Sequence, residues 1–411
     1  MREKLRVVVL GILGRTPFAG VAWQVLHYLE GLNRMGHDVC YIEDTGRWPF
    51  DPEQNVTTDK LDYTLNYIAR LMTWCGLTDR WAYCTPQPSD QTFGLSKTRI
   101  LKLLEQADAV IDLTGSTMLR EEHLRVPLRI YIETDPVLPQ IAVARGNQNY
   151  INQLSAYTHH FTYGENLGSP DCGVPVGKFH YFPTRQAIVL DWWKPDVCSL
   201  NAPSQSPVER FTTIASWRQP GNDVEWKGEI YTWSKHHEFL KFIELPSKIR
   251  QPLELALAVK GNCGKGENSW VPQYQEDAEA LHLLASHGWS LANAIPLSKD
   301  ILPYREYILG SRGEFTVAKD QNVRLRSGWF SDRSACYLAA GRPVVTQDTG
   351  FGNLLPTGKG LFAFTTMDDI IGAFEMIGSD YVGHCRAARE IAEEYFRAET
   401  VLAKLLTHAG L

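Results

Sequence analysis

Short runs of apolar and β-branched residues alternate with segments of helical periodicity over the first 190 residues of the chain. The expected strands of this part are residues 6–10, 39–42, 109–113, 128–132 and 161–164. Four apolar residues after the first strand recur at the spacing of one helix face: Val21, Val25, Leu29 and Leu32. Strands that are apolar on both faces are typical of a parallel sheet covered by helices on both sides. Ligands of such sheets bind at the carboxyl ends of the strands, so candidate site residues are sought there.

The same alternation starts a second time near residue 210. The expected strands of this second series are residues 211–215, 253–259, 314–318 and 343–346, followed by an amphipathic helix around 370–377 and a helical tail over 381–406. Residues 191–209, between the two series, are rich in proline, serine and asparagine, which is typical of a linker. The pattern predicts two α/β domains, over residues 1–190 and 210–380, with C-terminal helices over 381–411 that return to the first domain.

The composition and charge of the chain narrow the function classes. Its 411 residues include 41 basic and 47 acidic side chains, for a formal net charge of −6. A dedicated nucleic-acid-binding protein normally carries a basic excess, so nucleic acid is not expected as a partner, although it stays open as an acceptor. The shares of hydrophobic residues (44%) and charged residues (21%) are those of a globular protein, and two domains are the expectation at this length.

No feature of the sequence points to a membrane, to disulfide bonds or to a metal. The apolar runs are far shorter than a bilayer-spanning helix, and the first ten residues lack the long apolar region of a signal peptide. The eight cysteines form no CxxC pair, and the adjacent histidines at 159–160 and 236–237 have no third ligand at a usable spacing. We therefore expect a cytoplasmic chain with reduced thiols, no transmembrane segment and no metal site.

The most informative segment is Ser327–Gly350, SGWFSDRSACYLAAGRPVVTQDTG, which reads as a loop, a helix and a strand. The start of a helix presents unpaired N–H groups and the positive end of the helix dipole, which suits a diphosphate. Arg333 would add a fixed cation for phosphate oxygens. Three neighbours complete the expected binding segment: Ser331, Asp332 and Ser334. An ordinary capped helix in an α/β domain is the alternative.

This loop and helix, followed by Ala-Gly-x-Pro-Val-Val and a glycine-rich turn, resemble the donor-binding segment of GT-B glycosyltransferases, in particular bacterial family 1 and family 4-like members. The motif covers mainly residues 314–364, and the order of expected elements resembles the family over the whole chain. The resemblance implies two Rossmann-like domains that face each other across a cleft, with the acceptor in the first and the nucleotide-sugar in the second. It implies a hexosyltransferase that uses a nucleotide-diphosphate sugar, with a UDP-sugar expected first, an unidentified acceptor and no separate cofactor.

The segment departs from the family at two positions. Retaining members usually carry a glutamate, seven further residues and a second glutamate before the Ala-Gly-x-Pro motif, and Gly328 and Cys336 occupy these positions here. The absence of both carboxylates favours an inverting displacement. It also keeps two alternatives open, a nucleotide-sugar epimerase on the same fold and a binding protein that has lost its catalysis.

Basic residues in the second domain are the expected partners of the donor diphosphate. In many GT-B enzymes an arginine and a lysine after the first strand of this domain neutralise the leaving diphosphate, whose negative charge grows as the bond breaks. Arg218 and Lys227 match this arrangement, with Lys235 as the alternative lysine. Glu314 and Lys319, which flank a later strand, could hold a sugar hydroxyl or a phosphate, or Glu314 could form a buried ion pair.

The candidates in the first domain are a glycine-rich loop and several strand-end acids. Glycines let a backbone approach a ligand closely, so Gly14 and Arg15 are expected near the donor. The glycine spacing differs from GxGxxG, and a plain strand–helix turn is the alternative. An inverting transferase needs a base for the acceptor hydroxyl. Asp135 is the first choice because it lies just beyond a strand, and Asp112 and Glu165 follow.

Overall fold

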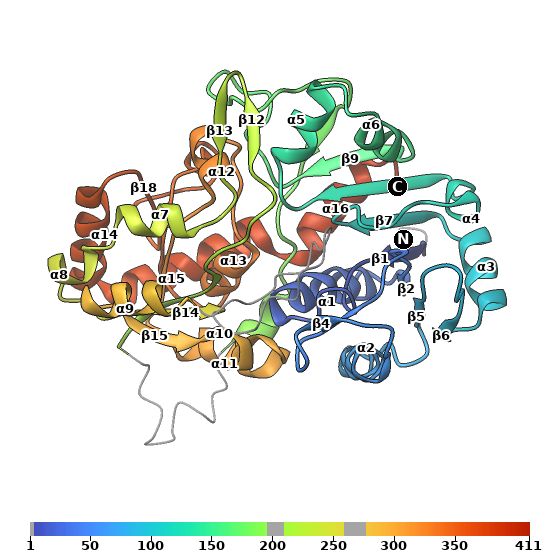
Figure 1. Cartoon of the computed structure of the whole chain (residues 1–411), viewed down its shortest axis with the longest axis horizontal. Coiled ribbons are helices and arrows are strands. Elements are labelled where there is room, and N and C mark those ends of the chain that lie inside the picture. The colour runs from blue at the N-terminus through green and yellow to red at the C-terminus, as the bar shows by residue number, and fades with distance from the viewer. Residues whose placement is uncertain (1–3, 195–208, 259–276) are drawn as a thin grey trace. The chain divides into compact units, whose positions relative to one another are not determined.

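The computed structural model describes residues 4–194, 209–258 and 277–411. Residues 195–208 of the expected linker and the last residue of the expected strand 253–259 lie outside this described part. The chain forms two compact units, which are coloured along the chain in Figure 1. The first unit contains Met1–Leu167, Pro175–Val189 and Ala398–Leu411, and the second contains Gly168–Val174 and Leu190–Arg397. Each unit is an α/β structure with its own sheet, which confirms the predicted fold class.

The first unit is built on an eight-stranded sheet with the order β10-β9-β8-β7-β1-β2-β5-β6. Its strands are β1 (Arg6–Leu10), β2 (Asp38–Glu43), β5 (Trp81–Cys84), β6 (Thr92–Gly94), β7 (Ala109–Leu113), β8 (Leu128–Glu133), β9 (His159–Thr162) and β10 (Tyr181–Pro183). All neighbours are parallel except β5 and β6. The strand order reverses at β1, which pairs with β2 on one side and β7 on the other.

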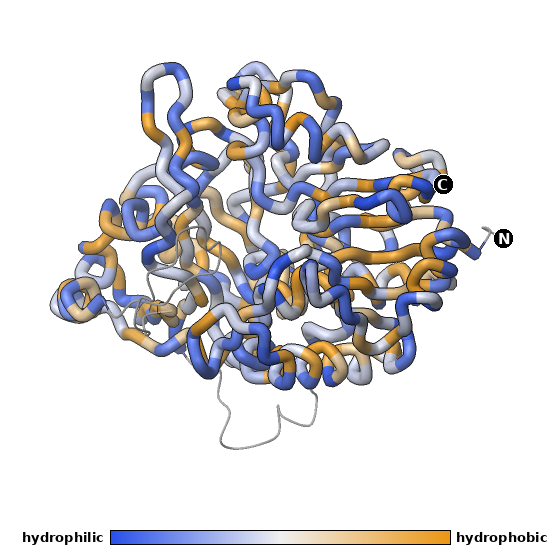
Figure 2. The backbone as a smooth tube through the Cα atoms, turned by 45° about the vertical axis from the view of Figure 1, so that its right-hand side comes forward, coloured by the Kyte–Doolittle hydropathy of each residue, from blue (hydrophilic) through white to orange (hydrophobic). Residues whose placement is uncertain are grey.

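Helices cover this sheet, as its apolar strands require. They are α1 (Ala19–Arg34), α2 (Asp62–Trp74), α3 (Lys97–Glu105), α4 (Glu121–Leu124), α5 (Leu138–Ala144), α6 (Gln148–Ser155) and α16 (Ala398–His408). A short antiparallel pair of strands, β3 (Phe50–Asp51) and β4 (Val56–Thr57), lies between β2 and α2 in the chain. The central strands of the sheet are coloured mostly as hydrophobic in Figure 2, because both of their faces are covered. Along the described residues, no helix combines the length and the apolar character that crossing a membrane would require.

The second unit is built on a six-stranded parallel sheet with the order β15-β14-β11-β16-β17-β18. Its strands are β11 (Phe211–Ser216), β14 (Leu253–Ala258), β15 (Ser290–Asn293), β16 (Gly313–Thr316), β17 (Val344–Gln347) and β18 (Leu361–Phe364). In chain order this is the arrangement 3-2-1-4-5-6 of a Rossmann sheet. A separate antiparallel hairpin, β12 (Val224–Trp226) and β13 (Glu229–Tyr231), follows β11.

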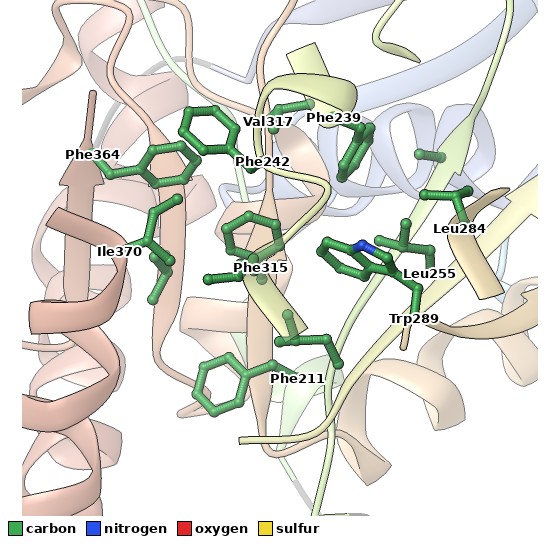
Figure 3. Packing of buried hydrophobic residues seen from close by; sticks show 14 of the residues in the cluster. Phe211, Phe239, Phe242, Leu255, Leu284, Trp289, Phe315, Val317, Phe364 and Ile370 are labelled. Atoms are coloured by element: carbon green, nitrogen blue, oxygen red, sulfur yellow. The ribbon is translucent and has the colours of Figure 1, made fainter. Parts of the chain in front are cut away.

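Aromatic side chains form the centre of the second unit (Figure 3). Phe315 of β16 stacks on Phe364 of β18 with the ring centroids 5.6 Å apart, and Trp289 lies 5.9 Å from Phe315 on its other side. The helices around this core are α7 (His236–Lys241), α8 (Leu245–Lys248), α9 (Ala278–Ser286), α10 (Ala294–Ser298), α11 (Ile301–Gly310), α12 (Asp320–Arg324), α13 (Asp332–Ala339), α14 (Met367–Ser379) and α15 (Tyr381–Ile391). Burial of these large rings, together with the aliphatic side chains around them, stabilises the unit.

The helical tail divides between the two units. Helix α15 belongs to the second unit, where Gly360 packs so closely against the backbone of Ala388 that a side chain at 360 would collide with it. A π-helical turn over Ala392–Phe396 and an extended Arg397 end this helix. Only α16 belongs to the first unit, where the N–H of Ala398 donates to the carbonyl of Ile188 at 2.9 Å. The return to the first unit therefore starts at residue 398, whereas the sequence pattern had suggested residue 381.

The packing of α16 against α1 has a measurable consequence. A Cβ atom at Gly31 of α1 would lie 2.5 Å from Cδ1 of Leu402 and 3.0 Å from Cβ of Ala398. Gly31→Val is therefore expected to lower the free energy of unfolding by about 1–3 kcal/mol, measured by urea denaturation. Gly372→Ala in α14 is the matched control, since no atom lies within 4 Å of its Cβ position and alanine favours a helix. A Gly31→Val protein as stable as the unchanged chain would show that α1 and α16 are not tightly packed.

Candidate functional site

The carboxyl edge of the second sheet opens between β11 and β16. These two strands pair only at Phe211–Gly313 and Thr212–Glu314, whereas β11 pairs with β14 as far as Ser216–Ala258. The strand order also reverses here, since β14 lies on one side of β11 and β16 on the other. Ligands of open α/β sheets bind at such a reversal, outside the carboxyl ends of the strands. The region outside the carboxyl ends of β11 and β16, beside this opening, is the candidate ligand site of the second unit.

Arg333 points into the sheet. Its guanidinium donates to Oε1 of Glu314 at 2.5 Å, to the carbonyl oxygen of Ile214 at 2.6 Å and to Oγ1 of Thr316 at 2.9 Å. Glu314 is fully buried, so its negative charge needs a partner within the unit. Glu314 therefore forms a buried ion pair, the alternative weighed for it in the sequence, and its partner is Arg333, whereas a phosphate contact of Arg333 stays a prediction.

Two lysines lie against tryptophan rings at the same edge. Lys319 follows β16, and its Nζ lies 3.0 Å from the centroid of Trp233. Lys235 lies directly before α7, and its Nζ lies 5.5 Å from the centroid of Trp329. Both lysines are less than a tenth exposed. Contact with an indole face restrains an ammonium group and lowers the cost of its burial, so both cations are held in fixed positions.

Arg218 and Lys227 occupy different surroundings. Arg218 lies two residues after the end of β11 and is more than half exposed, and it forms an ion pair with Asp277 at 2.5 Å. Its guanidinium also lies 3.5 Å from Nε2 of His236, whose pKa is lowered to about 4 by burial and by neighbouring positive groups. Lys227 lies in the turn of the β12–β13 hairpin with a φ of 52°, and its Nζ lies 5.9 Å from the Trp226 ring. Arg218 therefore lies at the strand end, and Lys227 lies at the end of the hairpin.

The loop before α13 has a backbone that explains the departure from the glutamate pattern. Gly328 has a φ of 80°, and its N–H donates to the carbonyl of Thr349 at 2.7 Å. A glutamate would be strained in this left-handed conformation. Cys336 faces the interior of the unit, and burial raises the pKa of its thiol well above the ordinary value. Neither position could hold a carboxylate toward a ligand in this backbone.

The start of α13 lies beside this loop. Ser331 is the residue before the helix, and Asp332 is in the first turn. The side chain of Ser331 makes no capping hydrogen bond, so it does not cover the N–H groups of the first turn. Ser334 is fully buried, and its hydroxyl has no hydrogen-bond partner among the described residues. The backbone of the first turn, rather than these side chains, is the part of α13 that suits an anion.

In the first unit, the glycine-rich loop after β1 is bound to a glutamate of β2. The N–H groups of Gly14 and Arg15 donate to the two carboxylate oxygens of Glu43 at 2.7 and 2.8 Å. Tyr41 donates its hydroxyl to the same carboxylate at 2.8 Å. Burial lowers the pKa of Arg15 to about 10. The N–H groups of Gly14 and Arg15 are thus bound within the unit, which favours the alternative of a plain strand–helix turn.

Two candidate acids of the first unit, Asp112 and Glu165, are likewise bound within it. Asp112 is fully buried at the end of β7 and accepts from the Tyr157 hydroxyl at 2.6 Å. Glu165 forms an ion pair with Arg185 at 2.6 Å. Asp112 as the base stays a prediction, but its buried carboxylate is already hydrogen-bonded within the unit, which makes it less suited to meet an acceptor hydroxyl. Glu165 is a weaker candidate than the sequence suggested, because Arg185 neutralises it.

Asp135 is half-buried in the turn that follows β8. Glu133, at the end of that strand, accepts from Nε2 of Gln140 at 2.7 and 2.6 Å. Gln140 in turn accepts the N–H of Val137 at 2.8 Å, which fixes Val137 at a φ of 96°. A β-branched residue rarely adopts this conformation, and strain of this kind concentrates at functional sites. The turn that holds Asp135 is therefore rigidly built.

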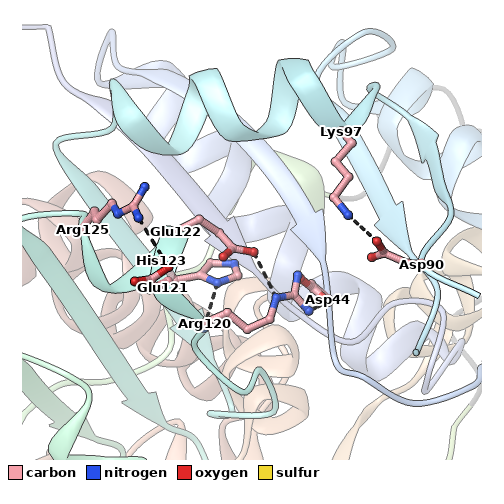
Figure 4. Close-up of polar contacts among 8 residues, drawn as sticks. All are labelled: Asp44, Asp90, Lys97, Arg120, Glu121, Glu122, His123 and Arg125. Atoms are coloured by element: carbon pink, nitrogen blue, oxygen red, sulfur yellow. Dashed lines mark hydrogen bonds and ion pairs between the residues drawn. The ribbon is translucent and has the colours of Figure 1, made fainter. Parts of the chain in front are cut away.

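The loop between β7 and α4 is fixed to the end of β2 by an ion pair (Figure 4). Arg120 donates to Oδ1 of Asp44 at 3.1 Å and contacts the second carboxylate oxygen as well. The N–H of Arg120 donates to Nδ1 of His123 at 3.2 Å, which requires that nitrogen to be unprotonated. Burial lowers the pKa of His123 and keeps the ring neutral. The loops on this edge of the first unit are thus held by contacts within the unit.

Comparison with known proteins now identifies the fold. No protein-family model and no curated protein matches the sequence. Solved structures match over nearly the whole chain. An α-glucosyltransferase in complex with UDP and a 13-mer DNA has a TM-score of 0.57 and 10% identity, over 99% of this chain and 100% of that one. Anabaena HepE in complex with UDP-glucose has a TM-score of 0.57 and 12% identity over 99% and 100%, and sucrose-phosphate synthase from Thermosynechococcus elongatus has a TM-score of 0.53 and 12% identity over 98% and 97%. The chain has the GT-B fold. At these identities the likeness establishes the fold alone.

The position of the β12–β13 hairpin in this GT-B chain had no signal in its sequence. The β12–β13 hairpin is attached to α12, since Arg324 donates to the carbonyl of Ile230 at 2.9 Å and Asp320 accepts the N–H of Thr232 at 2.9 Å. Glu43 could have been noticed, because an acid at the end of the second strand lies beside the loop after the first. Among the described residues, no group of three histidine, cysteine or acidic side chains could hold a metal ion.

We expect the buried acids of the first unit to make the protein less stable as the pH rises toward 7. Burial raises the pKa of Glu43, Asp112 and Glu133 to about 7. The folded protein then binds more protons than the unfolded chain between about pH 4 and pH 7, so the free energy of unfolding should fall as the pH rises through this window. Urea midpoints across the window measure the slope. Asp112→Asn cannot titrate and should flatten the slope, whereas stability that stays constant or rises would contradict the burial of these carboxyls.

Proposed function

We propose that the chain is a glycosyltransferase that moves a sugar from a nucleotide-diphosphate sugar, with a UDP-sugar as the first candidate, to an acceptor hydroxyl. The observation that carries the proposal is the match of the whole chain to solved proteins in complex with UDP or UDP-glucose. The second unit supports it independently, because its sheet has the Rossmann strand order and opens at the strand-order reversal.

The donor diphosphate is proposed to bind at the carboxyl edge of the second unit, close to Lys235 and Lys319. Each ammonium group is restrained by a tryptophan ring, so both are positioned before a ligand arrives. Preorganised cations stabilise the negative charge that grows on a leaving diphosphate. The first turn of α13 would add N–H groups for phosphate oxygens. Arg218 lies two residues after the end of β11 and is a further donor-site candidate.

Asp135 is proposed as the base that accepts the proton of the acceptor hydroxyl. It is half-buried and follows β8 at the carboxyl edge of the first sheet, in a turn that hydrogen bonds among Val137, Gln140 and Glu133 hold in place. A direct displacement with this base would invert the anomeric configuration. The acceptor itself is left unassigned. DNA is present in several of the similar structures, all of an α-glucosyltransferase, but the net charge of −6 does not favour a nucleic acid here.

Calorimetric titration of the full chain with UDP-, GDP- and ADP-sugars tests the donor proposal. We expect saturable binding of at least one nucleotide-sugar, with UDP-sugars first, and competition by the free nucleoside diphosphate. Competition is expected because the cations contact the diphosphate. Absence of binding across the whole panel would reject the proposal. Binding of the sugar-free nucleoside as tightly as the diphosphate would reject the assigned lysines.

A further inference from the structure

The opening between β11 and β16 is filled by one side chain. Beyond the pair Thr212–Glu314, β11 continues beside β14 and β16 continues beside β17, but β11 and β16 no longer pair with each other. The carbonyl of Ile214 in β11 therefore has no ladder donor from β16. It accepts instead from the guanidinium of Arg333 at 2.6 Å. The side chain thus takes the place of a missing strand-to-strand hydrogen bond.

The same guanidinium reaches the other strand. It donates to Oε1 of Glu314 at 2.5 Å and to Oγ1 of Thr316 at 2.9 Å, both in β16. Thr213 of β11 lies within 3.3 Å of the same Thr316 hydroxyl. Because a guanidinium is planar and its N–H groups point in fixed directions, it sets the distance between the two strands that it bridges.

Arg333 also belongs to the first turn of α13, directly after Asp332. Its side chain therefore ties the start of this helix to both strands at the opening. The loop that precedes the helix is tied to the end of β17, because Gly328 donates to the carbonyl of Thr349 at 2.7 Å. The direction of the first N–H groups of α13 thus depends on the bridge made by Arg333.

We infer that Arg333 is a positioning residue, which fixes the width of the opening between β11 and β16 and the place of the α13 N-terminus beside the donor. The expected change in the donor KM rests on the proposed function, whereas the expected change in the position of the α13 N-terminus does not. Arg333 does not contact the donor in this assignment. Its loss would misplace the N–H groups of α13 while leaving Lys235 and Lys319 unchanged.

Thr316 offers a test that leaves the charges of Arg333 and Glu314 in place. Thr316→Val removes the hydroxyl that Arg333 bridges to and keeps the shape of the side chain, whereas Thr316→Ser keeps the hydroxyl and removes a methyl group. With a UDP-sugar found in the titration above, Thr316→Val is expected to raise the donor KM about fivefold or more, while kcat stays within about twofold. Thr316→Ser is expected to restore most of the difference.

Amide hydrogen exchange gives a readout that does not need a donor. In Thr316→Val the amides of Gly328–Ser334 should exchange faster than in the unchanged chain, and Thr316→Ser should again resemble the unchanged chain. Arg333→Lys is the second variant, because it keeps the charge beside Glu314 but loses the planar fork. It should show the same faster exchange and, with a donor, the same rise in KM.

The outcomes separate the two claims. If the unchanged chain binds no nucleotide-sugar, the proposed function fails, and the exchange pattern alone still decides the inference. If the variants lower thermal stability but leave both the donor KM and the exchange of Gly328–Ser334 unchanged, Arg333 is only a structural ion-pair partner, and the inference is wrong.

Discussion

Asp135→Asn is expected to lower turnover by roughly 10²–10⁴ while donor binding stays intact, as is usual for the loss of a general base. Asparagine has the size of aspartate but cannot accept the proton of an acceptor hydroxyl. The turn around it should survive, because Val137, Gln140 and Glu133 are joined by hydrogen bonds of their own and asparagine keeps the size of the side chain. Steady-state kinetics with an identified acceptor, together with calorimetry of the donor, measure both parts of this prediction.

Two outcomes would contradict the role of Asp135. Glu165→Gln is the matched comparison, because Glu165 is another acid near a strand end of the same unit but forms an ion pair with Arg185. If Glu165→Gln loses turnover and Asp135→Asn does not, the base is Glu165. Retention of the anomeric configuration in the product, observed by NMR, would reject a direct displacement whichever acid is involved.

Lys319→Met is expected to weaken donor binding about tenfold or more, because a hydrogen bond between charged groups contributes about 1.5–3 kcal/mol. Methionine keeps the length of the apolar stem and its contact with the Trp233 ring, so the fold should be retained. Lys248→Met is the matched control. This exposed lysine ends α8 and lies before the amino end of β14, whereas Lys319 follows the carboxyl end of β16.

Calorimetry with the nucleotide-sugar and with the free diphosphate distinguishes a diphosphate contact from a sugar contact. Both ligands should lose affinity to Lys319→Met by a similar factor. Equal affinity of Lys319→Met and the unchanged chain would remove Lys319 from the donor site and leave Lys235 as the remaining lysine candidate.

The strands and helices were largely predictable because their patterns are local. Residues 6–10 and 109–113 are strands with the predicted bounds, and the helix expected around 370–377 is the central part of α14. The tail was harder, since the pattern of residues 381–406 is helical throughout. The break at Arg397 follows from the partners of each half, the second unit for α15 and α1 for α16. Those partners are far apart in the sequence.

The site was predictable only in part, because residue type does not give the direction of a side chain. Arg333 was expected to face a phosphate, and it faces Glu314 because a buried carboxylate requires a cation. Gly14 was expected to face a ligand, but Glu43 from the next strand accepts its N–H. Lys319 was expected at a strand end and lies there, but its contact with Trp233 depends on how the hairpin folds back.

The most direct test of the central claim is the release of nucleoside diphosphate when the full chain is incubated with each UDP-sugar, followed by anion-exchange chromatography. We expect UDP to accumulate with at least one UDP-sugar and an acceptor hydroxyl to accelerate its release. Lys319→Met and Asp135→Asn should both reduce the rate. UDP-sugars that stay intact with every acceptor offered, while the chain also fails to bind them, would contradict the central claim.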